Sequence, residues 1–171
     1  GHYWQLSGEE TWSLVCVEGL YQEHGAICAL SPKGKLFLIN PNTFSAVPVS
    51  LEKNECIVSV SQRPETLWVL TRTGEIYIRM GLSASSIHGN TWEKLDLHQI
   101  SDVHLCHISC GTEVVWGVDT RGGVYMRQGP LTPPPADSLP PAWIQVDPSP
   151  LMGNAVFTKV CDNIYIWISP D

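Results

Sequence analysis

The sequence predicts an all-β protein made of β-propeller blades, because one hairpin-like stretch recurs along the chain at the spacing of propeller repeats. Its clearest copy has an apolar run from Val114 to Val118, a turn from Asp119 to Gly123, and a β-branched and aromatic run from Val124 to Arg127. The copies recur about every 40 to 51 residues, and each carries four short β segments. Units of this kind are typical of four-stranded antiparallel blades that bury their faces against neighbouring blades.

Equivalent positions align the copies. The residue at the position of Trp116 recurs in the three other copies as Cys28, Trp68 and Trp167. Each of the four positions has an aromatic residue 24 positions earlier, in chain order Trp4, Phe44, Trp92 and Trp143. A turn glycine follows six residues later in the first three copies: Gly34, Gly74 and Gly122. An aromatic residue comes three positions after each glycine: Phe37, Tyr77 and Tyr125. Arg79 and Arg127 then follow the two tyrosines.

This alignment predicts one propeller segment over residues 1–171, with units at about 4–40, 44–81, 92–129 and 143–171. In the third unit the predicted strands are 92–97, 103–109, 114–118 and 124–127, and together they are expected to form one sheet. The last unit is incomplete, because Asp171 comes at the turn after Trp167. An unpaired strand edge is prone to aggregation, so the segment is expected to be part of a larger propeller.

Two stretches interrupt the repeat. Leu82 to Asn90 is rich in serine, and Gly129 to Ala142 carries six prolines, which predicts a stiff and exposed insertion. Since such stretches vary between units, function is expected in them and in the short turns between blades, rather than in the repeated positions.

Composition excludes several classes of partner. The net charge is −7 with only ten Lys and Arg residues, which gives little attraction for nucleic acid or anionic lipid. No apolar run approaches the roughly 20 residues that cross a bilayer, and no signal peptide is recognisable, so direct membrane insertion is not expected. The six cysteines fall mainly in apolar β runs and no Asn-x-Ser/Thr site occurs, which favours thiols in a reducing compartment.

The sequence contains no recognisable catalytic constellation. There is no nucleophile elbow, phosphate-binding loop or His-Glu-x-x-His, so we expect neither an enzyme nor a bound cofactor. The segment from His104 to Cys110 holds two histidines and two cysteines, but on a strand rising about 3.3 Å per residue its ends lie roughly 20 Å apart. A shared metal ion is therefore not predicted.

The repeated side chains are interpreted as structural. Trp68, Trp116 and Trp167 are expected to fill the interfaces between blades, with stacking on sugars as the alternative. Arg79 and Arg127 are expected to bond to or stack on a neighbouring blade, with anion binding as the alternative. The remaining structural positions are those of the turn glycines and the tyrosines: Gly74, Gly122, Tyr77 and Tyr125.

One short stretch has the pattern of a protein-docking motif. An aromatic residue followed three positions later by an aliphatic one, after acidic residues, can add as a β-strand to a ubiquitin-like protein. The best match is Glu9, Glu10, Trp12 and Val15. The same spacing recurs from Trp92, Trp143 and Tyr165 in predicted strands, so the pattern is weakly specific, and Trp12 and Val15 themselves fall where a blade strand should run.

These repeats resemble those of the tectonin β-propeller repeat family. The resemblance is strongest in the third unit, at Ile108-Ser-Cys-Gly111, Val115-Trp-Gly-Val-Asp119, Gly122 and Val124-Tyr-Met-Arg-Gln-Gly129. The second unit keeps Leu67-Trp-Val69, Gly74, Ile76-Tyr77, Arg79 and Gly81, whereas the first has Cys28 in place of the tryptophan.

The resemblance implies a non-enzymatic scaffold in autophagy and vesicle trafficking. Its implied partners are ubiquitin-like autophagosome proteins and membrane-tethering or coat complexes, and its implied location is the cytoplasm, peripheral on autophagosome or endoplasmic reticulum exit-site membranes. Secreted tectonins share the repeat and bind sugars, so a carbohydrate-binding lectin is the alternative.

Overall fold

The structure is a computed structural model that describes residues 11–17, 26–53, 55–63, 65–83, 85–111, 114–128, 142–147, 157–159 and 167–168. The first sheet contains β1 (Leu14–Val17), β2 (Ile27–Leu30), β3 (Leu36–Ile39) and β4 (Ala46–Val49). The second contains β5 (Ile57–Arg63), β6 (Thr66–Thr71), β7 (Ile76–Met80) and β8 (Trp92–Lys94). The third contains β9 (Leu105–Cys110), β10 (Val115–Asp119), β11 (Val124–Gln128) and β12 (Ala142–Val146). A two-stranded sheet of β13 (Phe157–Lys159) and β14 (Trp167–Ile168) follows.

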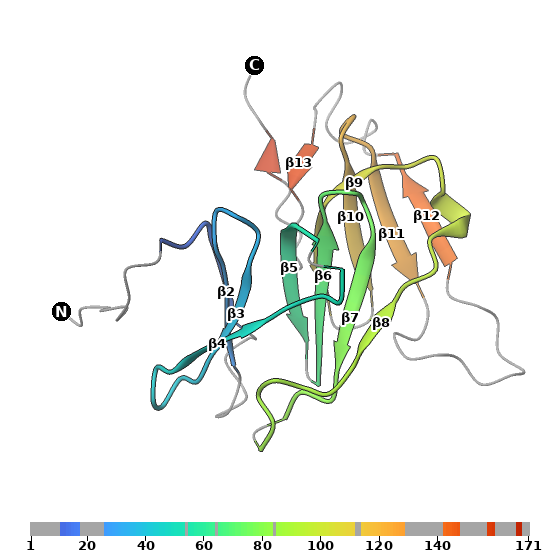
Figure 1. Cartoon of the computed structure of the whole chain (residues 1–171). Helices are drawn as coiled ribbons and strands as arrows, with labels where there is room; N and C mark the ends of the chain where they lie inside the picture. The colour runs from blue at the N-terminus through green and yellow to red at the C-terminus, as the bar shows by residue number, and fades with distance from the viewer. Residues whose placement is uncertain are drawn as a thin grey trace, which may run out of the picture.

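Each four-stranded sheet is an antiparallel meander, and the sheets stand side by side in chain order (Figure 1). The first strands of successive sheets are neighbours: β1 contacts β5, β5 contacts β9, and β9 contacts β13. Side chains connect two of these strands, since the Ser59 hydroxyl accepts from the Ile108 N–H at 3.2 Å and the Ser61 hydroxyl from the Cys110 N–H at 2.9 Å. This arrangement of four-stranded sheets around their first strands confirms the predicted all-β propeller blades.

The hairpin between the second and third strands of each sheet closes on a glycine with positive φ. The angles are +74° at Gly34, +86° at Gly74 and +83° at Gly122, a conformation that L side chains rarely adopt. Gly34 has a second constraint, because a Cβ there would stand 2.9 Å from the main-chain nitrogen of Ile57 in the second sheet. The predicted turn glycines therefore have a local geometric reason.

The apolar core lies between the sheets. Between the first and second sheets it includes Leu38, Leu67 and Val69, none of which is exposed. Between the second and third it includes Trp68 and Val115, which are also fully buried. Since the apolar side chains of a central sheet must cover both faces, its strands read as continuous apolar runs.

The predicted assignment of strands to sheets is wrong by one strand. Trp92–Lys94 was expected to begin the third sheet, but it is β8, the last strand of the second sheet, where Trp92 stands opposite Arg79. In the same way Trp143 is in β12 and stands opposite Arg127 in the third sheet. A repeat period gives the length of a unit but not the residue at which the unit begins. The boundary between sheets is set by the pairing of the outer strand with the preceding hairpin.

Phe44 does not occupy the place of Trp92 and Trp143, despite the shared offset of 24 positions. It lies in the loop before β4 with φ +54° and is 53% exposed. The residue that faces the third strand at the equivalent point is Ala46, opposite Ile39. The first sheet therefore has an Ile–Ala pair where the second and third have Arg–Trp pairs.

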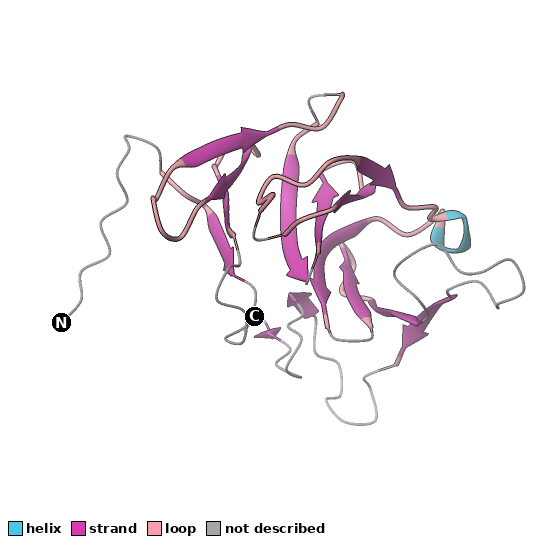
Figure 2. Ribbon diagram, turned by 90° about the horizontal axis from the view of Figure 1, so that it is seen from below, coloured by secondary structure: helices cyan, strands magenta, loops and turns pink. Residues whose placement is uncertain are grey.

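A single helical turn occurs among the described residues. It is the 3-10 turn η1 (His98–Ile100), drawn in cyan in Figure 2 at the outer side of the sheets. Within the described part of the chain, no helix has the length and apolarity that a membrane span requires.

Candidate functional site

The candidate site is the connector rim, which we define as the two turns 71–75 and 119–123 with the connector 95–103 between them. The connector leads from β8 to β9, so it lies at the end of the second and third sheets where β6 joins β7 and β10 joins β11. Thr71 and Asp119 hold the turns, since their carbonyls accept from Gly74 N–H at 3.0 Å and Gly122 N–H at 3.1 Å. Both sides of the connector are hollowed.

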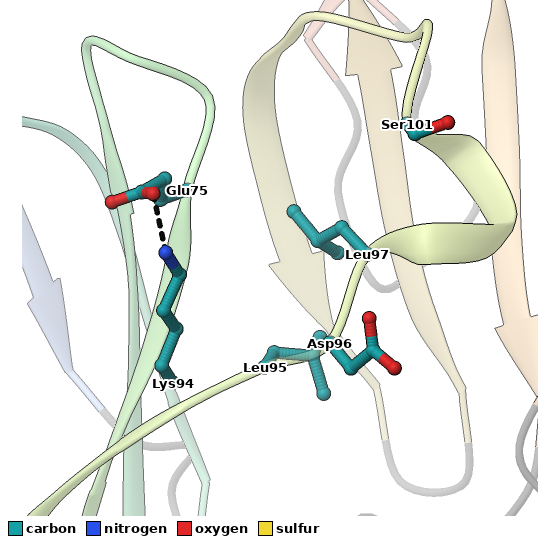
Figure 3. Close-up of a pocket in the computed structure, with 6 residues that line it drawn as sticks. All are labelled: Glu75, Lys94, Leu95, Asp96, Leu97 and Ser101. Carbon is teal, nitrogen blue, oxygen red and sulfur yellow. Dashed lines mark hydrogen bonds and ion pairs between the residues drawn. The ribbon is translucent and has the colours of Figure 1, made fainter.

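The first hollow has a volume of about 480 Å³ and is lined by residues of β8, the connector and one turn (Figure 3): Glu75, Lys94, Leu95, Asp96, Leu97 and Ser101. Lys94 forms an ion pair with Glu75, whose other carboxylate oxygen accepts from the Tyr77 hydroxyl at 2.8 Å. The hydrogen bond from Lys94, followed by that from Tyr77, lowers the pKa of Glu75 below 4.5. The Glu75 carboxylate is therefore already bonded to Lys94 and Tyr77 of the same protein at neutral pH.

The second hollow has a volume of about 600 Å³ and lies on the other side of η1. Its walls come from the connector, one turn and β12: Gln99, Ile100, Asp102, Val103, Asp119, Arg121, Gly123, Tyr125, Trp143 and Gln145. Asp119 is only 5% exposed and organises the turn, because one of its oxygens accepts from the N–H groups of Arg121 at 2.8 Å and Gly123 at 2.7 Å. The Tyr125 hydroxyl donates to its other oxygen at 3.2 Å.

Tyr125 is a neutral hydroxyl in this hollow. Burial and then the charge of Asp119 raise the pKa of Tyr125, because both disfavour the phenolate. The charged groups of this hollow are of both signs, since Arg121 lines it together with Asp102 and the buried Asp119.

The predicted structural residues lie between and within sheets. Trp68 is fully buried, and the guanidinium carbon of Arg127 in the next sheet stands 5.9 Å from its ring centre. Arg79 instead stacks on Trp92 of its own sheet at 5.3 Å and donates to the carbonyl of His88 at 2.8 Å. Arg79 thus holds the loop 82–90 that the sequence singled out, and Arg127 contacts the neighbouring sheet.

The other repeated residues have less uniform surroundings. Trp116 is half-buried and packs with Val118 and Val124 on the third sheet. Trp167 lies in β14. The proline-rich stretch 129–141 lies outside the described residues.

The predicted docking residues do not form one surface. Trp12 packs edge-on against Phe37, with ring centres 5.1 Å apart, whereas Val15 is 52% exposed in β1. Burial alternates along this strand, with Leu14 and Cys16 packed on the core, so Trp12 and Val15 project to opposite sides. Glu9 and Glu10 lie outside the described residues.

The sequence reasoning missed the connector rim. The connector 95–103 was predicted to be strand at its two ends, within 92–97 and 103–109, whereas β8 ends at Lys94 and β9 begins at Leu105. It carries none of the repeated residues, so a search restricted to matching positions passes over it. Asp119 was placed in the turn but not recognised as its organising carboxylate. Among the described residues no group of three or more His, Cys, Asp or Glu side chains is arranged to hold a metal ion.

Comparison with known proteins shows which proteins these repeats are similar to. No family model matches the sequence. The chain is 42% identical over 159 residues to human Tectonin beta-propeller repeat-containing protein 2. The resemblance to tectonin β-propeller repeat proteins is thereby confirmed. The alignment covers 86% of this chain and 11% of that relative, so the chain spans about a tenth of the relative's length.

Solved structures show the same fold. Human WBSCR16 matches with a TM-score of 0.55 at 14% identity, covering 86% of this segment and 40% of that chain. YCF48 bound to D1 peptide matches at 0.52 and 14% identity, over 71% and 38% of the two chains. BBS1N in complex with ARL6DN matches at 0.51 and 16% identity, also over 71% and 38%. These are β-propellers, and at such identities the likeness concerns the fold alone.

Proposed function

We propose that this tectonin-type segment is a non-enzymatic protein-interaction scaffold, which contributes propeller blades to a partner-docking surface. The observation that carries the proposal is the connector rim, where two hollows flank one exposed connector and mix carboxylates with apolar side chains. Such concave, polar-edged surfaces suit side chains of a partner protein. The printed titles of two propeller neighbours, YCF48 with D1 peptide and BBS1N with ARL6DN, name protein partners for those proteins.

The pathway proposed is autophagy and vesicle trafficking. It rests on the similarity to Tectonin beta-propeller repeat-containing protein 2 and on what the family resemblance implies. The partners proposed are ubiquitin-like autophagosome proteins and membrane-tethering or coat complexes, met in the cytoplasm at autophagosome or endoplasmic reticulum exit-site membranes. The rest of a longer propeller chain is proposed to complete the docking surface.

A binding experiment with two matched variants tests this function. Purified segment is immobilised, and binding of the ubiquitin-like proteins and of tethering or coat subunits is measured by biolayer interferometry. Asp102→Arg reverses an exposed charge on the connector rim, and Glu65→Arg makes the same change at the turn between β5 and β6, at the other end of the sheets. Weaker binding for the first variant alone supports the rim. Absence of binding by every partner class overturns the scaffold.

Carbohydrate binding is the alternative that the repeat leaves. Trp68 exposes none of its surface, and the Lys94 ammonium lies over the Tyr77 ring at 6.0 Å from its centre, so these two rings do not offer a free stacking face to a sugar. A glycan array that shows saturable binding would favour the lectin over the scaffold.

A further inference from the structure

The first sheet carries a pair of cysteines where the second and third sheets carry a serine and a tryptophan. In those two sheets the register sets a serine of the first strand opposite the tryptophan of the second: Ser61 with Trp68, and Ser109 with Trp116. At the equivalent point of the first sheet, blue to cyan in Figure 1, Cys16 of β1 stands opposite Cys28 of β2. Both members of the repeated pair are therefore cysteine in one sheet.

The two cysteine side chains lie on the same face of the first sheet. Cys28 belongs to the apolar core between the first and second sheets, and Cys16 packs against that core. Residues directly opposite on antiparallel strands project to one face, so the two sulphur atoms are cross-strand neighbours. Both are thiols in the structure, Cys28 fully buried and Cys16 half-buried. A reagent in solution therefore reaches Cys16 first.

The main-chain geometry of this pair suits a strained disulfide. The Leu30 carbonyl accepts from the Ser13 N–H at 2.8 Å, so the main-chain groups of Cys28, two residues earlier, turn to the same strand and pair with Cys16. Opposed residues of this hydrogen-bonded kind have Cα atoms about 5.5 Å apart, a usual separation for disulfides. Their Cβ atoms are roughly 5 to 5.5 Å apart, whereas disulfides prefer about 3.8 Å. Closing this gap strains the bond, and a strained disulfide is easily reduced again.

Cys28 also connects the first sheet to the second. Its thiol donates to the side-chain oxygen of Gln62 in β5 at 3.1 Å, and both residues are buried. A disulfide removes the hydrogen from the Cys28 sulphur, so this bond between the sheets is lost and a buried amide oxygen loses that donor. The oxidation state of one strand pair is therefore coupled to the packing of two sheets.

We propose that Cys16 and Cys28 form a reversible cross-strand disulfide, which ties β1 to β2 and loosens the packing of the first sheet on the second. The oxidant is a low-molecular-weight disulfide of the glutathione class. The Cys16 thiolate attacks one of its sulphurs and releases one glutathione thiolate. The Cys28 thiolate then attacks the Cys16 sulphur of the mixed disulfide and releases the second. Two protein thiols lose two electrons and two protons, and one glutathione disulfide becomes two molecules of glutathione.

Peptide mass spectrometry of the 171-residue chain, equilibrated in glutathione buffers of increasing oxidised fraction, tests the proposal. Remaining thiols are alkylated, and the chain is cut after Lys, Arg and Glu, which separates the two cysteines at Glu18 and Glu23. Peptides 11–18 and 24–33 are expected to become linked before any other pair of cysteines, and dithiothreitol is expected to separate them again. The same chain unfolded in guanidinium chloride is the control, in which several pairs are expected to form together.

Single substitutions of the two cysteines test the order of attack. Cys28→Ser keeps a donor for Gln62 but removes the second attacking sulphur, so Cys16 is expected to accumulate as a mixed disulfide with glutathione. Cys16→Ser leaves only the fully buried Cys28, which is expected to stay alkylatable after unfolding and to carry no glutathione. Circular dichroism checks that both variants fold.

A matched pair of glutamine variants tests the coupling to the second sheet. Gln62→Leu removes the acceptor of the Cys28 thiol, a weak donor, so the reduced state loses one hydrogen bond and the equilibrium constant for oxidation is expected to rise about two- to fivefold. Gln145→Leu makes the same change at an exposed residue of β12 and is expected to leave that constant unchanged.

The outcomes are decided on the wild-type chain first. Linkage of Cys16 to Cys28 ahead of the other pairs, in the folded chain alone, supports the disulfide. The proposal is overturned if the folded chain links the same mixture of pairs as the unfolded chain, or if both cysteines remain alkylated when oxidised glutathione is in excess. Equal effects of Gln62→Leu and Gln145→Leu overturn the coupling between the disulfide and the second sheet.

Discussion

Replacing Trp68 tests whether the sheets pack as blades around a buried tryptophan. The side chain is fully buried between the second and third sheets, where truncation leaves a large cavity. Trp→Ala changes in cores cost about 3 to 5 kcal/mol, and the stacking of Arg127 at 5.9 Å adds about 0.5 to 2 kcal/mol. Alanine also removes the buried indole N–H, which has no acceptor among the described residues and costs about 1 to 3 kcal/mol, so we expect Trp68→Ala to lower the free energy of unfolding by about 2 to 5 kcal/mol.

Trp68→Phe should cost far less, for a reason particular to this site. The indole N–H of Trp68 is buried with no acceptor among the described residues, and such a donor destabilises the folded state by about 1 to 3 kcal/mol. Phenylalanine removes that donor, which offsets the roughly 1 to 2 kcal/mol lost with the smaller apolar area. The net change is expected to stay within about 1 kcal/mol of the wild type.

Equilibrium unfolding in guanidinium chloride, followed by circular dichroism, measures both changes. Ile144→Ala, at a residue 43% exposed, serves as the surface control and should change stability by less than about 0.5 kcal/mol. If Trp68→Ala costs no more than this control, the tryptophan does not fill a blade interface. If Trp68→Phe costs as much as Trp68→Ala, the unpaired indole is not a destabilising feature.

Three further predictions concern the turns, the rim and the loop. Gly122→Ala should destabilise by about 1 kcal/mol in thermal unfolding because of its φ of +83°, and Gly34→Ala by more, because its Cβ would also stand 2.9 Å from the main chain of Ile57; equal losses would contradict this. The pKa of Glu75 is lowered in the folded protein, so the contribution of Glu75 to stability is present above pH 4.5 and is lost as pH falls through the folded pKa. In Lys94→Met, a carbon-13 titration should show the pKa of Glu75 returning toward 4.5. An unchanged pKa would exclude the ion pair as the main cause of the lowering. Arg79→Met removes the hydrogen bond to the His88 carbonyl, which is worth about 1.5 kcal/mol or more, so amide hydrogen exchange should accelerate at least tenfold in loop 82–90. Unchanged exchange there would show that Arg79 does not hold the loop.

Local features of the sequence predicted most of the strands. The hairpin around Gly122 could be read directly, because a β-branched run, a turn with a positive-φ glycine and a second run are specified by neighbouring residues. The burial of Trp68 could be predicted because it recurs at equivalent positions of successive apolar strands. Its neighbour Arg127 was predicted to contact another blade and does so, whereas Arg79, in the same pattern, stacks within its own sheet.

The connector rim could not be predicted in this way. Asp102 and Asp119 are 17 positions apart, and nothing in their spacing shows that they line one hollow with Trp143. A search for known motifs also passes over Lys94 and Gln145, because they are recognised as equivalent only when the second and third sheets are compared. Only the strand register shows that Lys94 stands opposite Tyr77 in one sheet and Gln145 opposite Tyr125 in the next.

The sequence by itself determined the repeat, the hairpins and the aromatic positions, since each depends on residues that are close along the chain. The tertiary structure decided where one blade ends and the next begins. A periodic chain of four strands can be divided at any of four places, and the pairing of Trp92–Lys94 with β7 selects one of them. That pairing sends the connector 95–103 across to β9, and the hollows on the rim exist because of this crossing.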